Sequence, residues 1–271
     1  MTDNVNEKFK LALIKLKQKN YQEAIKLFDE IIITTAPVSS VVTLETYSIS
    51  EWEYIDDITL IERDIGTKEA SFDGHLALSL LFKIAQNNER RNEYIQKALK
   101  LNSNNFRIWR EYGETTFQLG NIRQALLQFQ EATNLNFNDS LCQEGIGLCY
   151  YYLDEPIKAI SPLRKALSLD QKNHCIMNHL SFILSEIGEL DEAHDLILQA
   201  LQLDEANNIY LDTYACILFL QERYDESLKI FEKILGNKPK DWEISWDILT
   251  NLYETLGLRV KAKQLEEKLN L

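Results

Sequence analysis

Residues that interrupt helices are scarce in this sequence. Glycine occurs 9 times and proline 4 times in 271 residues. Folds made of many short strands need such residues at their tight turns, whereas long helices joined by short connections do not. The scarcity therefore argues against an all-β architecture and favours an all-helical one.

Basic residues are also in short supply. The chain has 29 Lys and Arg against 42 Asp and Glu, which gives a net charge of −13. Nucleic acids and anionic membrane surfaces attract basic proteins, so we expect neither as a partner. We find no apolar run long enough to span a bilayer and no apolar segment typical of a secretory signal near the N-terminus. These features predict a cytoplasmic protein.

Motifs that carry chemistry are missing as well. The four cysteines (Cys142, Cys149, Cys175 and Cys216) show no CxxC pair and no zinc-ligand spacing. Cys175 and His179 lie four residues apart, as two metal ligands on a helix would, but nothing nearby completes a site. The sequence has no glycine-rich phosphate loop and no arrangement typical of a catalytic nucleophile. We therefore expect no metal, no cofactor and no enzymatic activity.

The sequence does contain a strong repeat with a period of 34 residues. Three series of small residues share this period: Ala98, Ala132, Ala166 and Ala200; Ala125, Ala159, Ala193 and Ser227; and Gly113, Gly147, Ser181 and Ala215. Large apolar residues such as Trp109, Tyr112 and Phe129 recur beside them. Small residues are needed where two helices cross closely, and large ones fill the adjacent space. Each period therefore predicts one pair of antiparallel helices.

This pattern resembles the tetratricopeptide repeat, in which W-x2-L-G-x2-Y is followed by A-x3-F, then Ala, then Pro. The resemblance implies an all-α, right-handed superhelical solenoid of antiparallel helix pairs. We predict an N-terminal helix pair over 1–35 and an irregular insert over 36–71. Six tandem repeats are then predicted over 72–105, 106–139, 140–173, 174–207, 208–242 and 243–271.

The insert departs from the repeat pattern. Ser50 and Glu53 fit a capping box, and apolar residues then recur on one helical face, which predicts a helix over 51–65. Three interpretations remain open for residues 36–71. They form an eroded repeat, or an insert that folds over the groove or docks a partner, or a disordered segment.

The resemblance also implies a binding groove, because the first helix of each repeat lines the concave face in this family. The predicted groove residues are Arg110, Glu114, Leu148, Tyr151, Tyr152, Asn178, His179, Phe182, Asp212 and Phe219. An apolar floor with acidic flanks suits a peptide or helix that has apolar anchors and could carry basic flanks. The Lys/Arg and Asn pattern with which some family members bind a C-terminal carboxylate is not matched.

These features favour a protein–protein interaction scaffold or adaptor. Within the same family, a secretion or assembly chaperone is an alternative. A self-assembling structural protein is another, because apolar residues of the C-terminal repeat could pair with a second copy to form a homo-oligomer.

Overall fold

The computed structural model describes residues 2–35, 61, 71–236 and 244–269. Fourteen helices lie in these ranges, and the regular secondary structure there is helical throughout. The chain forms two compact units, unit 1 (Met1–Glu155) and unit 2 (Pro156–Leu271), which are treated separately. Except for Ile61 and Ser71, the predicted insert over 36–71 and its helix over 51–65 lie outside the described residues.

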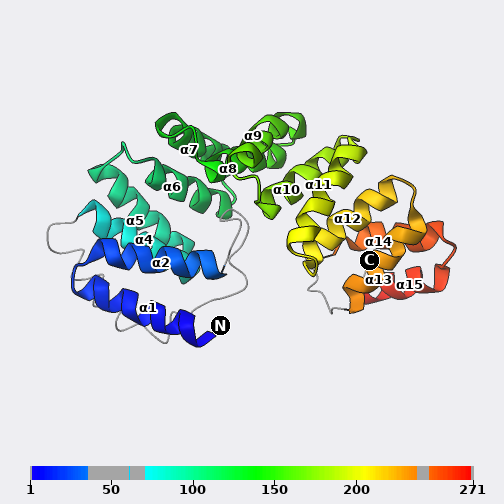
Figure 1. Ribbon diagram of the computed structural model, residues 1–271, viewed down its shortest axis with the longest axis horizontal. Coiled ribbons are helices and arrows are strands. Elements are labelled where there is room, and N and C mark those ends of the chain that lie inside the picture. Colours follow the sequence, from blue (N-terminus) through cyan, green and yellow to red (C-terminus); the bar gives the residue numbers. More distant parts are fainter. Residues whose placement is uncertain (1, 36–60, 62–70, 237–243, 270–271) are drawn as a thin grey trace. The chain divides into compact units, whose positions relative to one another are not determined.

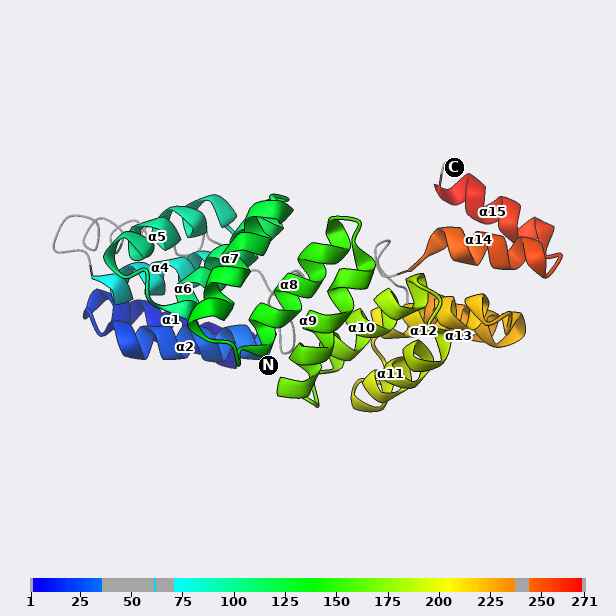
Figure 2. The same cartoon turned by 90° about the horizontal axis from the view of Figure 1, so that it is seen from above.

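Unit 1 is a row of helices in which each one contacts the next described one along the chain (Figure 1). Figure 2 shows the same helices, coloured blue to green, lying side by side in a second view. The helices are α1 (Thr2–Lys17), α2 (Tyr21–Thr35), α4 (Phe72–Ile84), α5 (Asn88–Leu101), α6 (Phe106–Gln118), α7 (Ile122–Leu135) and α8 (Ser140–Tyr152).

Unit 2, taken by itself, is also a row of helices. It contains α9 (Pro156–Leu169), α10 (His174–Glu186), α11 (Leu190–Leu203), α12 (Asn208–Leu220), α13 (Tyr224–Gly236), α14 (Trp246–Thr255) and α15 (Arg259–Leu269). Successive helices contact one another, and α12 also contacts α10 and α14. The predicted fold of packed helix pairs is therefore confirmed.

Helix starts follow from a further 34-residue series, formed by Asn105, Asp139, Asn173 and Asn207. Each residue precedes a helix, and its side-chain oxygen accepts a hydrogen bond from a backbone N–H of the first turn. Such N-caps stabilise a helix by about 1 kcal/mol. The caps explain why α6, α8, α10 and α12 begin at equivalent positions of the period.

The turns within helix pairs use a left-handed backbone conformation. Gly120, Gly188 and Gly257 have φ values of 80°, 86° and 72°, a conformation that glycine adopts at little cost. Other turns adopt the conformation without glycine, and among them Asp154 has a φ of 63°. A residue with a Cβ atom pays about 1–2 kcal/mol for this conformation.

Gly113, one of the predicted small residues, and Gly145, which lies outside the predicted series, occur where helices approach closely. A Cβ atom added to Gly113 on α6 would lie 2.8 Å from the ring of Phe129, and one added to Gly145 on α8 would lie 2.6 Å from it. Phe129 of α7 is fully buried between these positions. The close approach therefore requires glycine on both neighbouring helices.

In unit 2, serine and alanine share this role. Ser181 of α10 donates a hydrogen bond from its Oγ to the carbonyl oxygen of Ala193 on α11, at 2.6 Å. In the next helix pair the residue types are exchanged, since Ser227 of α13 donates to the carbonyl oxygen of Ala215 on α12, at 2.8 Å. Both hydroxyls are fully buried, so each needs this acceptor.

The core of unit 1 contains buried residues from the helices on both sides of the insert, including Phe28 of α2 and Phe82 of α4. Ile61 belongs to the same cluster and is 2% exposed. Ile61, one of the two described residues of the predicted insert, is therefore part of the hydrophobic core of unit 1.

Candidate functional site

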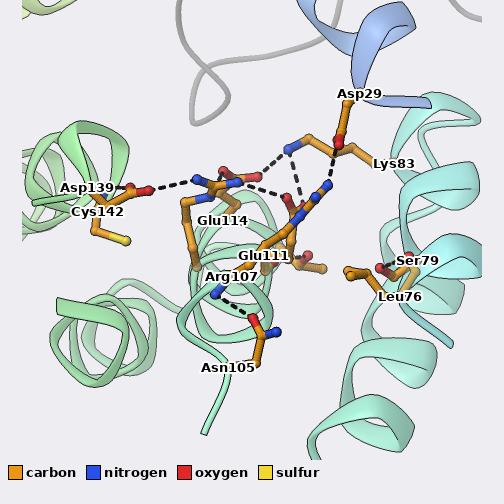
Figure 3. Close-up of polar contacts among 12 residues, drawn as sticks. Asp29, Leu76, Ser79, Lys83, Asn105, Arg107, Glu111, Glu114, Asp139 and Cys142 are labelled. Carbon is orange, nitrogen blue, oxygen red and sulfur yellow. Dashed lines mark hydrogen bonds and ion pairs between the residues drawn. The ribbon is translucent and has the colours of Figure 1, made fainter. Parts of the chain in front are cut away.

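The most unusual feature of unit 1 is a set of buried charged side chains, here called the ion-pair cluster. It consists of Lys83 on α4, Arg91 on α5, and Arg110, Glu111 and Glu114 on α6. Figure 3 shows Lys83 directed toward Glu114 and Glu111 from a neighbouring helix. The side chains of Lys83, Arg91, Glu111 and Glu114 are each at most 3% exposed.

The two carboxylates of the cluster are shared between two cations. Arg91 Nη2 lies 2.6 Å from Glu111 Oε2 and 2.9 Å from Glu114 Oε2. Lys83 Nζ lies 3.3 Å from the same Glu111 oxygen and also contacts Glu114. Each buried charge therefore has charged hydrogen-bond partners, as burial requires.

Arg110 of the cluster and a further arginine, Arg107, extend the network to other helices. Arg110 Nη1 lies 2.9 Å from Asp139 Oδ2, while the other oxygen of Asp139 caps α8 by accepting from the backbone N–H of Cys142. Arg107 of α6 donates to Asp29 of α2 (Figure 3). Polar contacts thus connect α6 with α2, α4, α5 and the start of α8.

The electrostatics of the cluster are balanced. Burial alone would raise the pKa of the Glu111 carboxyl, but Lys83, Arg91 and Arg110 lower it well below its ordinary value. Burial would lower the pKa of Arg110, but Glu111, Glu114 and Asp139 raise it above its ordinary value. Glu111 and Arg110 therefore keep their charges at neutral pH.

Sequence reasoning did not identify Arg91 or Lys83. A usable signal was present, because Arg91 lies 34 residues before Ala125 and so occupies the small-residue position of α5. An arginine at a helix crossing must direct its charge toward a buried partner. Two glutamates follow 20 and 23 residues later, on the next helix along the chain, and these are its partners.

The predicted groove residues of unit 1 differ in accessibility. Glu114 is fully buried and Leu148 is 4% exposed within a core cluster around Phe129. This differs from the expectation that both line an open groove, because Glu114 neutralises buried cations and Leu148 fills the core. Arg110 is half-buried in its ion pair with Asp139.

Tyr151 and Tyr152, also predicted, are more accessible. Together with Phe117 they form what is here called the aromatic patch. The ring of Tyr152 lies 5.3 Å from that of Phe117 and 5.4 Å from that of Tyr151, nearly perpendicular to both at 81° and 79°. Tyr152 is 59% exposed, while the other two are half-buried. Such edge-to-face pairs are favourable arrangements of aromatic rings.

In unit 2, three of the five predicted groove residues are half-buried ring side chains on α10 and α12. Asn178 is buried at 6% exposure, whereas His179 and Phe182 on the same helix are half-buried. Phe219 is half-buried and its ring lies 5.5 Å from that of Tyr224. The more accessible members are therefore His179, Phe182 and Phe219.

The fifth residue, Asp212, is bound to another helix. Its Oδ1 accepts from the backbone N–H of Ser245 and its Oδ2 from the Ser245 hydroxyl, both at 2.7 Å. Ser245 is the N-cap of α14, so Asp212 links α12 to the start of that helix. Burial raises the pKa of Asp212 to about 6, and the hydrogen bonds from Ser245 limit the rise.

The thiols of Cys142, Cys149 and Cys216 are held in their protonated form. Burial raises the pKa of Cys149 to about 12 and raises the pKa values of Cys142 and Cys216 further. Within the described ranges, no three or more His, Cys, Asp or Glu side chains gather as ligands for a metal ion. In the same part of the chain, no helix combines the length and apolar character needed to cross a bilayer.

No protein-family model matches the sequence. BBSome complex member BBS4 of Bos taurus is 31% identical over 132 residues, which cover 47% of this chain and 24% of that protein. Anaphase-promoting complex subunit 3 of Schizosaccharomyces pombe is 24% identical over 184 residues, covering 62% of this chain and 28% of that protein. The chain spans about a quarter of the length of these curated relatives.

Similar solved structures cover more of the chain. A tetratricopeptide repeat protein from Parabacteroides merdae has a TM-score of 0.61 at 18% identity, covering 73% of this chain and 78% of that one. PilF of Pseudomonas aeruginosa has a TM-score of 0.58 at 18% identity, with coverages of 89% and 95%. YrrB, described as a TPR protein with an unusual peptide-binding site, has a TM-score of 0.54 at 17% identity, with coverages of 67% and 93%. The predicted resemblance is confirmed, and the chain has the fold of the tetratricopeptide-repeat proteins.

Proposed function

We propose that the protein is an interaction scaffold that binds a peptide or helix of a protein partner on the first helices of its repeats. The observation that carries the proposal is the aromatic patch, in which Tyr152 remains 59% exposed. Exposed aromatic side chains are typical anchors of protein interfaces. In unit 2, Phe182 and Phe219 are half-buried side chains of the same kind on α10 and α12.

The comparisons support this function in outline. Two of the curated relatives are named as members of multi-subunit complexes, and one structural neighbour is described as having a peptide-binding site. The fold presents extended rows of helices, which is a geometry suited to long segments of a partner. The proposal also includes apolar anchors and basic flanks on the partner's segment, and an adaptor role for this protein.

Because the ion-pair cluster is buried, the residues expected to bind the partner differ from those predicted from the sequence. Glu114 has its charge neutralised by Lys83 and Arg91. Tyr151, Tyr152 and Phe182 have side chains that reach the surface of their units. We therefore assign partner binding to these aromatic side chains.

An affinity capture from native lysate tests the proposal with the full chain. Wild type is compared with a Tyr151→Ala, Phe182→Ala double variant and with Leu127→Ala as the control. Leu127 is 63% exposed on α7, a second helix of a repeat, so its loss removes exposed apolar surface elsewhere. We expect a protein that is captured by wild type and by the control and is lost with the double variant.

The fold of each variant is checked by circular dichroism and thermal unfolding. Equal capture by the double variant and wild type would contradict binding through these aromatic residues. Capture of further copies of this chain alone would favour a self-assembling protein instead.

A further inference from the structure

We propose that Cys175 is a site of reversible modification by small-molecule disulfides such as glutathione disulfide, and that the modification prevents partner binding on the neighbouring surface of α10. The thiol owes its reactivity to a hydrogen-bonded chain that joins Cys175 to Tyr210 and His174, here called the thiol relay. The loss of binding rests on the proposed function, whereas the chemical step does not.

The thiol relay combines residues of two helices. His174 and Cys175 are the first residues of α10, and Tyr210 lies in the first turn of α12. The Tyr210 hydroxyl oxygen lies 2.7 Å from His174 Nδ1 and 3.0 Å from Cys175 Sγ. Tyr210 is 3% exposed, while His174 and Cys175 are half-buried. The hydroxyl is therefore held inside the unit, and both of its neighbours are partly accessible.

This arrangement permits proton transfer from the thiol to the imidazole. The Tyr210 hydroxyl carries one proton, so it can accept from the thiol while it donates to Nδ1 of a His174 ring whose own proton is on Nε2. Movement of one proton along each hydrogen bond then gives a Cys175 thiolate and a His174 imidazolium. A thiolate is the nucleophilic form of cysteine, and it is favoured next to an imidazolium and in the first turn of a helix.

The other three cysteines have environments that oppose a thiolate. Cys149 is fully buried, and burial raises its pKa to about 12. The thiols of Cys142 and Cys216 lie near the carboxylates of Asp139 and Asp212, whose negative charges add to the effect of burial and raise the pKa of each thiol. Cys175 contrasts with them because its thiol meets a neutral hydroxyl that is linked to an imidazole.

The modification is a thiol–disulfide exchange. The Cys175 thiolate attacks one sulfur of glutathione disulfide, so a new S–S bond forms as the old one breaks. The other glutathione leaves as a thiolate and takes up the proton held by His174. Cys175 is oxidised and the released glutathione is reduced, and an excess of free thiol reverses the exchange.

The modified residue lies on the proposed binding surface. Cys175, His179 and Phe182 are spaced four and three residues apart, so they share one face of α10. Phe182 is one of the aromatic side chains to which partner binding is assigned. It lies about 10 Å from Cys175 along the helix, and an extended tripeptide such as glutathione spans about the same distance. The adduct is therefore expected to cover the surface that the partner contacts.

Peptide mapping by mass spectrometry, after brief exposure of the full chain to glutathione disulfide at neutral pH, tests the chemical step. We expect Cys175 to react about three- to ten-fold faster in the folded protein than in the protein unfolded in urea, because folding assembles the relay. Tyr210→Phe keeps the ring and removes the hydroxyl, so it should lose this advantage. Tyr214→Phe, which removes the hydroxyl of a half-buried tyrosine on the same helix, is the control and should react like wild type.

A second variant guards against a loss of folding in Tyr210→Phe. His174→Gln removes the proton acceptor at a half-buried position and should slow the reaction in the same way. Circular dichroism and thermal unfolding establish that each variant is folded. Equal rates for Cys175 in the folded and unfolded protein, or an unchanged rate in both variants, would overturn the thiol relay.

The effect on binding is measured separately, by the capture from native lysate. Wild type treated with glutathione disulfide should lose its partner and regain it after treatment with dithiothreitol, whereas capture by Cys175→Ala should be the same before and after treatment. Undiminished capture by modified wild type would overturn the loss of binding. If untreated wild type captures no partner, the proposed function fails, and the reaction rates still decide whether the relay activates Cys175.

Discussion

Phe129 determines the size of the residues around it. Its fully buried ring lies between α6 and α8, and the positions facing it on those helices hold Gly113 and Gly145. A Cβ atom at either position would lie within 3 Å of the ring, closer than two such atoms normally approach. The ring and the glycines therefore depend on one another.

Gly113→Ala is expected to lower the free energy of unfolding by about 1–3 kcal/mol, because an overpacked core must shift to admit the methyl group. Urea denaturation would measure the change. Gly236→Ala is the matched control, because a Cβ there meets no described atom within 4 Å. Recovery of part of the loss by adding Phe129→Leu would identify the ring as the cause, and no recovery would contradict it.

For single residues, the sequence predicts the structure where one backbone geometry requires one residue type. The positive φ of Gly120, Gly188 and Gly257 was predictable because glycine adopts it at little cost. The role of Arg91 was not predicted, because an arginine at a small-residue position can be explained only by partners on another helix. The surface exposure of Tyr152 depends likewise on neighbours that are distant in sequence.

Among the helices, α12 and α14 share an apolar cluster and are also linked by the carboxylate of Asp212. Asp212 accepts two hydrogen bonds from Ser245 at the start of α14. The two helices come from different predicted repeats, so this contact crosses a repeat boundary. Sequence periodicity placed Asp212 in a binding groove, and it could not show that a later helix would occupy the carboxylate.

This contact predicts a pH dependence of stability. Burial raises the pKa of Asp212 from 3.8 to about 6. Between these two pH values, Asp212 is therefore protonated in the folded state and ionised in the unfolded state. Stability contributed by this group therefore falls as pH rises from about 4 to about 6, by on the order of 2–3 kcal/mol, and is constant above that.

Asp212→Asn should remove this contribution, so the variant gains stability relative to wild type as pH rises through the same range. Chemical denaturation at several pH values would measure it. Asp195→Asn, whose carboxylate is 80% exposed, serves as the control and should show no such trend. An identical pH profile for Asp212→Asn and wild type would refute the assignment to Asp212.

For the whole molecule, the main asymmetry is that buried charge is concentrated in unit 1. Lys83, Arg91, Glu111 and Glu114 are all within that unit, as are Asp29 and Asp139, which extend the network. In repeat proteins each repeat contacts mainly its neighbours, so stability is distributed along the chain. The ion-pair cluster should therefore determine local stability near α4 to α6.

Glu114→Gln is expected to cost about 3–5 kcal/mol, because it leaves the buried cations of Lys83 and Arg91 with too little negative charge. Hydrogen exchange of backbone amides would follow the effect along the chain. We expect faster exchange in α4, α5 and α6 and little change in α12 and α13. Glu93→Gln, which breaks an exposed pair with Lys97, should cost under about 1 kcal/mol.

A second variant shows whether charge balance is the cause. In this variant Lys83 and Arg91 are both replaced by Met, and Glu111 and Glu114 are both replaced by Leu. It should recover most of the stability that Glu114→Gln loses, because apolar side chains of similar volume need no charged partners. Uniform acceleration of exchange over both units, or no recovery in the apolar variant, would count against a local electrostatic role.

For the whole molecule, too, the sequence predicts the repeated features better than the features that occur once. A 34-residue period of small and large residues predicts stacked helix pairs because packing at every crossing repeats. The ion-pair cluster interrupts this period at Arg91 and Lys83, where the contacts join different helix pairs. Function on such a fold resides in non-repeated side chains, which is why the candidate site was less accessible to sequence reasoning than the fold.

The exchanged serine and alanine of unit 2 have a consequence for how such chains can change. Ser181 donates to Ala193 across one crossing, and Ser227 donates to Ala215 across the next. Each of these two crossings holds one serine and one alanine, and either helix can supply either residue. During evolution, an intermediate with serine on both helices can lose either serine, so the serine and the alanine can exchange places. Related sequences are therefore expected to show paired substitutions at the two positions, and no invariant serine at one of them.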